Sequence, residues 1–137
     1  MSDTAAKPRP QFRNISISNI SQYRLPWAGK VSILHRVSGV LLFLCIPLVI
    51  LPLFERSVTS EVGFASLHAL VSFPLVKLVL LALIWGYLHH FCAGIRFLVL
   101  DLHIGTSKEG SRKSAVSVLV VSLALTALFG LKLFGVW

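Results

Sequence analysis

Three long apolar runs, separated by charged residues, dominate the chain. No charged residue occurs within positions 37–54, 78–95 or 114–131, so each run is 18 residues long. At about 1.5 Å of rise per residue, an α-helix of this length spans roughly 27 Å, which is close to the hydrocarbon thickness of a bilayer. The pattern therefore predicts an all-α membrane protein with three transmembrane helices.

The helices are expected to run past the flanking charges, because lysine and arginine side chains at helix ends can extend to the lipid headgroups. The expected organisation is a polar N-terminal segment, residues 1–30, followed by a membrane domain, residues 31–137, with spans at about 31–54, 75–100 and 114–134. The N-terminal segment contains no apolar run, so we expect no secretory signal peptide. It also lacks the arginine-rich, acid-free pattern of a long transit peptide.

Proline, glycine and polar residues indicate the breaks between these helices. Pro47 and Pro52 predict a kink or an early end in the second half of the first helix. Residues 55–74 are expected to form a connector, and residues 102–113 a polar loop.

Small residues recur along one side of the third span. Ser122, Thr126 and Gly130 follow one another at intervals of four, so they share one helix face. Such a face allows close approach of another helix. The approaching helix belongs either to this chain or to a partner subunit.

The composition is typical of a membrane protein, and the distribution of cations predicts its orientation. The chain is 55% hydrophobic and only 13% charged, whereas about a quarter of the residues in an average soluble domain are charged. The net charge is +8, and ten of the 13 cations lie before the first run or between the second and third. Because cations concentrate in cytoplasmic segments, the N-terminus is expected in the cytoplasm and the C-terminus on the opposite side. The basic residues form no stripe with aromatic ones, so no nucleic-acid partner is expected.

The first group of polar residues lies where the first span begins. Ser32, His35 and Arg36 are spaced at i, i+3 and i+4, so they share a helix face that continues to Gly39. A hydroxyl, an imidazole and a guanidinium together can bind a carbonyl group, a carboxylate or a propionate. The alternative is that His35 and Arg36 only hold the helix end at the headgroups.

The second group lies in the second span, where His89 and His90 are followed by Gly94. The pattern alone does not separate His89 from His90, and only His90 has a glycine, Gly94, one turn away on the same face. A glycine there leaves room for a flat macrocycle ligated by the histidine. Histidine is the usual axial ligand of an electron-transfer haem. A second ligand would come from His35 or from a partner chain. The alternative is an intramembrane histidine that hydrogen-bonds a neighbouring helix.

The two groups are expected at the same depth. His90 lies about 8 Å inside the cytoplasmic end of the second span, the end at which Ser32 and Arg36 also lie. This clustering favours one composite site over two unrelated features. Asp101 is expected to pair with Arg96 or with an arginine that precedes the first span.

Two motifs resemble the cytochrome b subunit of succinate dehydrogenase. The first comprises Tyr-Arg-Leu-Pro at 23–26 and Ser-Ile-Leu-His-Arg-Val-Ser-Gly at 32–39. The second is His-x3-Gly-Ile-Arg-x4-Asp at 90–101. They occur in the family's order, on the first and second of three spans, so the resemblance covers most of the chain.

The resemblance implies a set of partners, cofactors and site residues. This family forms the membrane anchor of succinate:quinone oxidoreductase, with a second anchor subunit, an iron–sulfur subunit and a flavoprotein subunit. It implies a haem b shared with the second anchor, with His90 as the axial ligand to the iron and His35 near the propionates. Ser32 and Arg36 match the ubiquinone-binding residues. Phe97 replaces a histidine found in some relatives, so no propionate contact is expected there.

The implied function is electron transfer from succinate, through iron–sulfur clusters, to ubiquinone, as part of the respiratory chain and the tricarboxylic acid cycle. The chain carries no dicarboxylate site, so it is expected to be a subunit of an enzyme and not catalytic alone. A multi-pass protein of the bacterial inner membrane is favoured over one of the mitochondrial inner membrane. The alternatives are a purely structural anchor without haem, and a small transport or proton-relay protein that uses His35, Arg36, His89 and His90.

Overall fold

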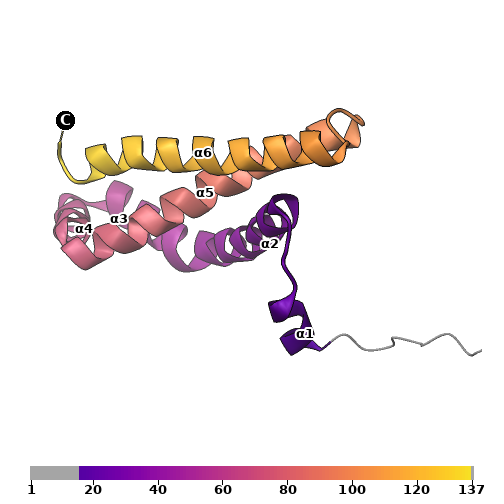
Figure 1. Ribbon diagram of the computed structural model, residues 1–137. Helices are drawn as coiled ribbons and strands as arrows, with labels where there is room; N and C mark the ends of the chain where they lie inside the picture. The colour runs from indigo at the N-terminus through magenta and orange to yellow at the C-terminus, as the bar shows by residue number, and fades with distance from the viewer. Residues whose placement is uncertain (1–15, 137) are drawn as a thin grey trace, which may run out of the picture.

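The computed structural model describes residues 16–136, and within that range it contains helices and no strands (Figure 1). Residues 1–15 of the predicted N-terminal segment lie outside the described residues. The elements are α1 (Ile17–Gln22), α2 (Trp27–Cys45), the π-helical η1 (Ile46–Ile50), α3 (Leu51–Thr59), α4 (Glu61–Ser72), α5 (Pro74–Asp101) and α6 (Lys108–Leu133). The predicted all-helical class is therefore confirmed for the part of the chain that is described.

Three helices are long and apolar enough to cross a membrane, as the three apolar runs predict. They cover Trp27–Thr59, Pro74–Asp101 and Lys108–Leu133, with 33, 28 and 26 residues. At about 1.5 Å per residue they measure roughly 50, 42 and 39 Å, so each exceeds the hydrocarbon thickness of about 30 Å. The helices continue through the charges that flank each apolar run, as expected.

The first spanning helix changes its hydrogen-bonding pattern at its prolines and does not end there. Pro52 has no N–H to donate to Leu48, and its ring crowds the carbonyl of that residue. The π-helical turn η1 lies immediately before this point, and the Leu51 N–H bonds to the Ile46 carbonyl, five residues back. The helix then resumes as α3 and ends at Thr59. Of the two expected outcomes, a kink or an early end, the structure thus has a local distortion within a continuing helix.

Both connectors are shorter than the sequence suggests. Most of the expected connector 55–74 is helical, because α3 extends into it and α4 follows after the single residue Ser60. The Ser60 hydroxyl accepts a hydrogen bond from the Gly63 N–H at 3.0 Å and so caps α4. The expected loop 102–113 is reduced to residues 102–107. Ser107 caps α6 in the same way, accepting from the Gly110 N–H at 3.1 Å.

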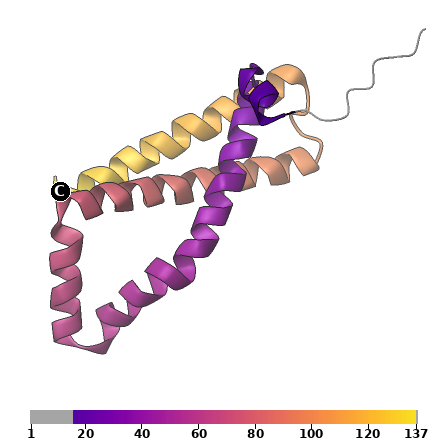
Figure 2. The ribbon, with the colours of Figure 1, turned by 90° about the horizontal axis from the view of Figure 1, so that it is seen from below.

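The three spanning helices form an open bundle. Helices α5 and α6 run antiparallel and side by side, and α2 packs across both of them near the loop that joins α5 to α6 (Figures 1 and 2). From there α2 diverges from α5, and α4 returns the chain to the start of α5 (Figure 2). The buried core accordingly lies at the loop end of the bundle, where Val31, Ala93, Ala115 and Val118 cluster.

The small residues of α6 pack within this chain. Ser122, Thr126 and Gly130 are all buried, and a Cβ added at Gly130 would lie 3.0 Å from the Leu81 Cδ1 atom of α5. The two hydroxyls are satisfied inside α6, because Ser122 donates to the Leu119 carbonyl at 3.1 Å and Thr126 to the Ser122 carbonyl at 2.6 Å. Of the two interpretations of this face, packing within the chain is the one that the structure supports.

We expect Ser122→Leu to destabilise the protein, because the Ser122 side chain is fully buried and a leucine there must displace its neighbours. Overpacking of this kind typically costs about 1–3 kcal/mol. The thermal unfolding midpoint of the purified protein in detergent would measure the effect. Val120→Leu is the matched control, since Val120 is 60% exposed on the same helix. Equal midpoints for the two variants would contradict the packing described here.

Candidate functional site

The central feature of the site is a pair of stacked imidazoles, His35 from α2 and His90 from α5. Their ring centroids lie 4.1 Å apart and the ring planes are 3° from parallel. The Nδ1 atom of His90 lies 3.0 Å from the backbone oxygen of His35, to which only a protonated nitrogen can donate. His90 therefore carries its proton on Nδ1, which leaves the lone pair of Nε2 available to a metal.

Ser38 completes the hydrogen bonds around His90. Its hydroxyl lies 3.2 Å from His90 Nδ1 and donates to the His35 carbonyl at 3.0 Å. Ser38 is buried, so its position is fixed by packing as well as by these bonds. No role was expected for Ser38 from the sequence. Its spacing of three residues from His35 was the available signal, since it places both on one helix face.

Two glycines adjoin this contact between helices, and one of them is required for it. A Cβ at Gly39 would lie 2.9 Å from His90 Cε1, closer than real Cβ atoms come, so the His90 ring occupies the space that a side chain would need. A Cβ at Gly94 would lie 3.8 Å from His35 Nε2, an ordinary contact. Gly94, the glycine expected beside His90 on α5, therefore adjoins His35. The ring of His90 packs against Gly39 of α2 instead.

Phe97 borders the same cluster. Its ring centroid lies 5.0 Å from that of His35, with the planes 56° apart. An apolar ring thus covers one side of His35.

Ser32 and Arg36 lie on α2, within one turn of His35 on its N-terminal and C-terminal sides. Ser32 is half-buried and Arg36 is exposed. Within residues 16–136, no hydrogen bond or ion pair joins either of them to another residue. Both side chains are therefore available to a group outside this chain.

His89 points to a different part of the bundle from His90. Its side chain has no exposed surface, and neither ring nitrogen makes a hydrogen bond of ordinary geometry among the described residues, although the ring interacts with the Val31 backbone. The centroid of the Trp85 ring lies 5.4 Å from that of the His89 ring. The buried Nε1 of Trp85 also has no hydrogen-bond partner among the described residues. His89 is enclosed by the protein, whereas only His90 has a hydrogen bond that fixes its ring and prepares Nε2 for ligation.

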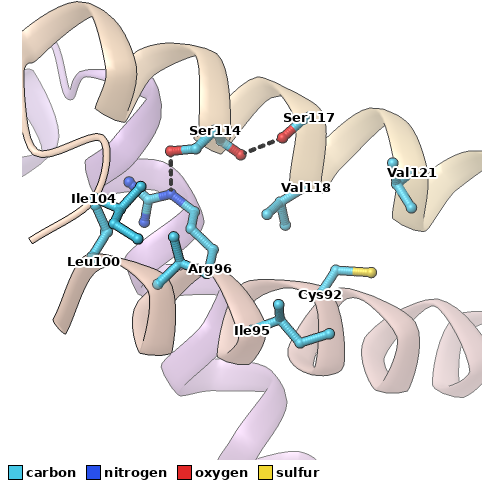
Figure 3. Close-up of a pocket in the computed structure, with 10 residues that line it drawn as sticks. Cys92, Ile95, Arg96, Leu100, Ile104, Ser114, Ser117, Val118 and Val121 are labelled. Carbon is cyan, nitrogen blue, oxygen red and sulfur yellow. Dashed lines mark hydrogen bonds between the residues drawn. The ribbon is translucent and has the colours of Figure 1, made fainter. Parts of the chain in front are cut away.

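Arg96 joins the end of α5 to the beginning of α6, as Figure 3 shows. Its Nε donates to the Ser114 hydroxyl at 3.0 Å, and one terminal nitrogen donates to Ser111 Oγ at 3.0 Å and to the Ser111 carbonyl at 3.3 Å. The expected pairing of Asp101 with Arg96 is wrong, because Arg96 turns into the bundle toward α6 and Asp101 is exposed.

The donor set fits a haem ligated by one histidine from this chain. His90 presents Nε2, and its Nδ1–H bond to a backbone carbonyl is the arrangement that commonly orients a metal-binding histidine. No group of three or more His, Cys, Asp or Glu residues that could hold a metal ion occurs within residues 16–136. At this cluster the described residues thus offer a single free imidazole nitrogen, that of His90, to a metal-containing group.

Comparison with known proteins agrees with these observations. Residues 6–129 match the family model described as the succinate dehydrogenase/fumarate reductase transmembrane subunit. The succinate dehydrogenase cytochrome b556 subunit of Coxiella burnetii is 36% identical over 120 residues, which cover 87% of this chain and 91% of that one. The subunit of the same name from Paracoccus denitrificans is 30% identical over 128 residues, covering 93% and 94% of the two chains. That from Rickettsia felis is 30% identical over 114 residues, covering 80% and 85%.

Proposed function

Because the chain belongs to the family of succinate dehydrogenase/fumarate reductase transmembrane subunits, we propose that it ligates haem b jointly with a second anchor subunit and forms part of a ubiquinone-reduction site. The observation that carries the proposal is the hydrogen bond from His90 Nδ1 to the His35 carbonyl, which leaves Nε2 as the ligating nitrogen. When bound, the haem supplies a one-electron carrier within the membrane.

The second axial ligand is proposed to come from the partner anchor subunit. Two axial histidines direct their nitrogens at one iron from opposite sides. The His35 and His90 rings instead lie face to face at 4.1 Å, an arrangement with no room for an iron between them. This contact argues against His35 as the second ligand. It supports a role in which His35 fixes the His90 ring. The position of His35 near the haem propionates is proposed from the family alone.

Ser32 and Arg36 are proposed to bind ubiquinone at the cytoplasmic end of α2. The Ser32 hydroxyl donates a hydrogen bond to one quinone carbonyl, and Arg36 offsets the negative charge that the quinone gains as it is reduced. The availability of both side chains supports this role. Electrons reach the quinone from the iron–sulfur subunit, while the flavoprotein subunit holds the dicarboxylate site.

The proposed orientation puts the N-terminus in the cytoplasm and the C-terminus on the opposite side of the bacterial inner membrane. The cations before α2 and around the loop between α5 and α6 support it, because cytoplasmic segments carry an excess of lysine and arginine. His90, Ser32 and Arg36 then lie toward the cytoplasmic side. An iron–sulfur subunit bound to that surface would be close to the quinone.

Haem ligation can be tested by replacing each of the adjacent histidines. We expect His90→Ala to abolish the b-type band in the reduced-minus-oxidised spectrum of the purified complex. His89→Phe is the control and should keep the band, because it replaces two unpartnered nitrogens with carbon at similar volume. A normal spectrum for His90→Ala would refute the assignment, and a complex without haem absorbance in the wild type would favour a purely structural anchor.

The close contact at Gly39 offers a second test of the same site. Gly39→Ala introduces a Cβ that would lie 2.9 Å from His90 Cε1, so the ring must move and its alignment with the haem iron must change. We expect a shifted haem reduction potential or partial haem loss. Gly29→Ala on the same helix is the control, because its Cβ would meet only ordinary contacts from 3.5 Å outward. If the two variants have identical spectra and potentials, the Gly39 contact does not control the ligand.

The quinone site can be separated from succinate oxidation by the choice of electron acceptor. We expect Ser32→Ala to lower kcat/KM for a soluble ubiquinone analogue by about tenfold, the loss of one hydrogen bond, and Arg36→Leu by about 10- to 100-fold. Succinate oxidation with an artificial dye should be unchanged. Lys30→Gln, which removes another cation of α2, is the control. Unchanged quinone reduction in both variants would overturn the assignment.

A further inference from the structure

A groove of about 300 Å³ runs between α5 and α6, beside Arg96 (Figure 3). Its lining comes from α5, α6 and the loop that joins them, and shares no residue with the His35–His90 cluster. Arg96, Ser114 and Ser117 contribute polar atoms at one end. The rest of the wall is apolar and includes Ile95, Val99, Ile104, Val118 and Val121.

Arg96 is a buried cation without a balancing anion in this chain. Its side chain is only 7% exposed, and its hydrogen bonds go to neutral oxygens of Ser111 and Ser114. Among the described residues the one ion pair joins Glu109 to Lys113 at 2.7 Å, and Asp101 is exposed. The Phe97 ring, whose centroid lies 5.3 Å from the guanidinium carbon, offsets this charge only in part. A buried charge without a counterion is unfavourable, so the site favours an anion. One terminal nitrogen of Arg96 has no hydrogen-bond partner among residues 16–136 and can donate to it.

The shape of the groove restricts the anion to an amphiphile. From Ser114 to Val121 the wall extends by seven residues, or about 10 Å along α6, away from the loop and into the apolar span. A free anion would use only the Arg96 end, whereas an acyl chain would cover the apolar wall. Lys108 and Arg112 lie at the beginning of α6 and add positive potential at the same end, where Lys113 is paired with Glu109.

We propose that this groove binds an anionic phospholipid, with the phosphate on Arg96 and an acyl chain along the wall that ends at Val121. Ser111 and Ser114 are positioning residues, because their oxygens hold two nitrogens of the guanidinium and leave the third for the lipid. The lipid would connect α5 to α6 across the short loop and stabilise the end of the bundle that carries the core. The proposal does not depend on haem or quinone binding.

The test uses the purified, delipidated complex. Native mass spectrometry and the thermal midpoint would be measured after addition of phosphatidylglycerol, phosphatidylcholine with the same chains, or inorganic phosphate. We expect phosphatidylglycerol to remain bound and to raise the midpoint, phosphatidylcholine to bind at least tenfold more weakly, and phosphate to have no effect. Equal binding of the two lipids, or an equal effect of phosphate, would overturn the proposal.

Two pairs of variants locate the site. Arg96→Gln should lower phosphatidylglycerol binding at least tenfold, and Arg56→Gln, which removes an exposed arginine of α3 outside the groove, is its control. Because Arg96→Gln could also weaken folding, Val121→Phe blocks the groove with Arg96 intact and should lower binding equally. Its control is Val120→Phe, which adds the same ring to the neighbouring exposed position. Equal lipid binding by Val121→Phe and Val120→Phe would refute the site, as would a wild-type complex in which a partner subunit fills the groove and no lipid binds.

Discussion

The contact between α2 and α5 at the His90 ring is the constraint on which the rest of the site depends. Gly39 leaves the space that the ring occupies, and the His35 carbonyl fixes which nitrogen carries the proton. The same contact brings the first and second spans together at one end of the bundle, where the buried core also lies. A change in this approach would alter the position of the His90 ring and the packing at once, because both use the same few atoms.

In a membrane, the energetic cost of leaving a buried polar group of the bundle unpaired is high. In hydrocarbon a polar atom without a partner costs several kcal/mol, so buried hydroxyls and imidazoles in a spanning helix require hydrogen bonds or a function. Ser122 and Thr126 meet this condition within α6, and His90 meets it through α2. His89 and Trp85 do not meet it among the described residues. Arg96 meets it only in part, since its hydrogen bonds leave its charge unbalanced.

Most of the architecture could be predicted from the sequence, but several local features could not. The three spans follow from charge-free runs of 18 residues, because helix length and bilayer thickness are both set by simple geometry. The π-helical turn before Pro52 and the helix within residues 61–72 were not predicted. Proline patterns indicate a disturbance without specifying its form, and a polar connector can be helical when a cap such as Ser60 is present.

The sequence by itself determined which residues could carry chemistry, since so few polar side chains occur at membrane depth, and it favoured His90 over His89. It could not determine the partners of those residues, because contacts between helices depend on rotation and approach that a single-helix pattern does not contain. Only the tertiary structure decided that His90 stacks on His35 against Gly39, with Ser38 beside it. Only the tertiary structure decided that Arg96 binds α6 and does not pair with Asp101. In the bundle interior the guanidinium donates to the oxygens of Ser111 and Ser114.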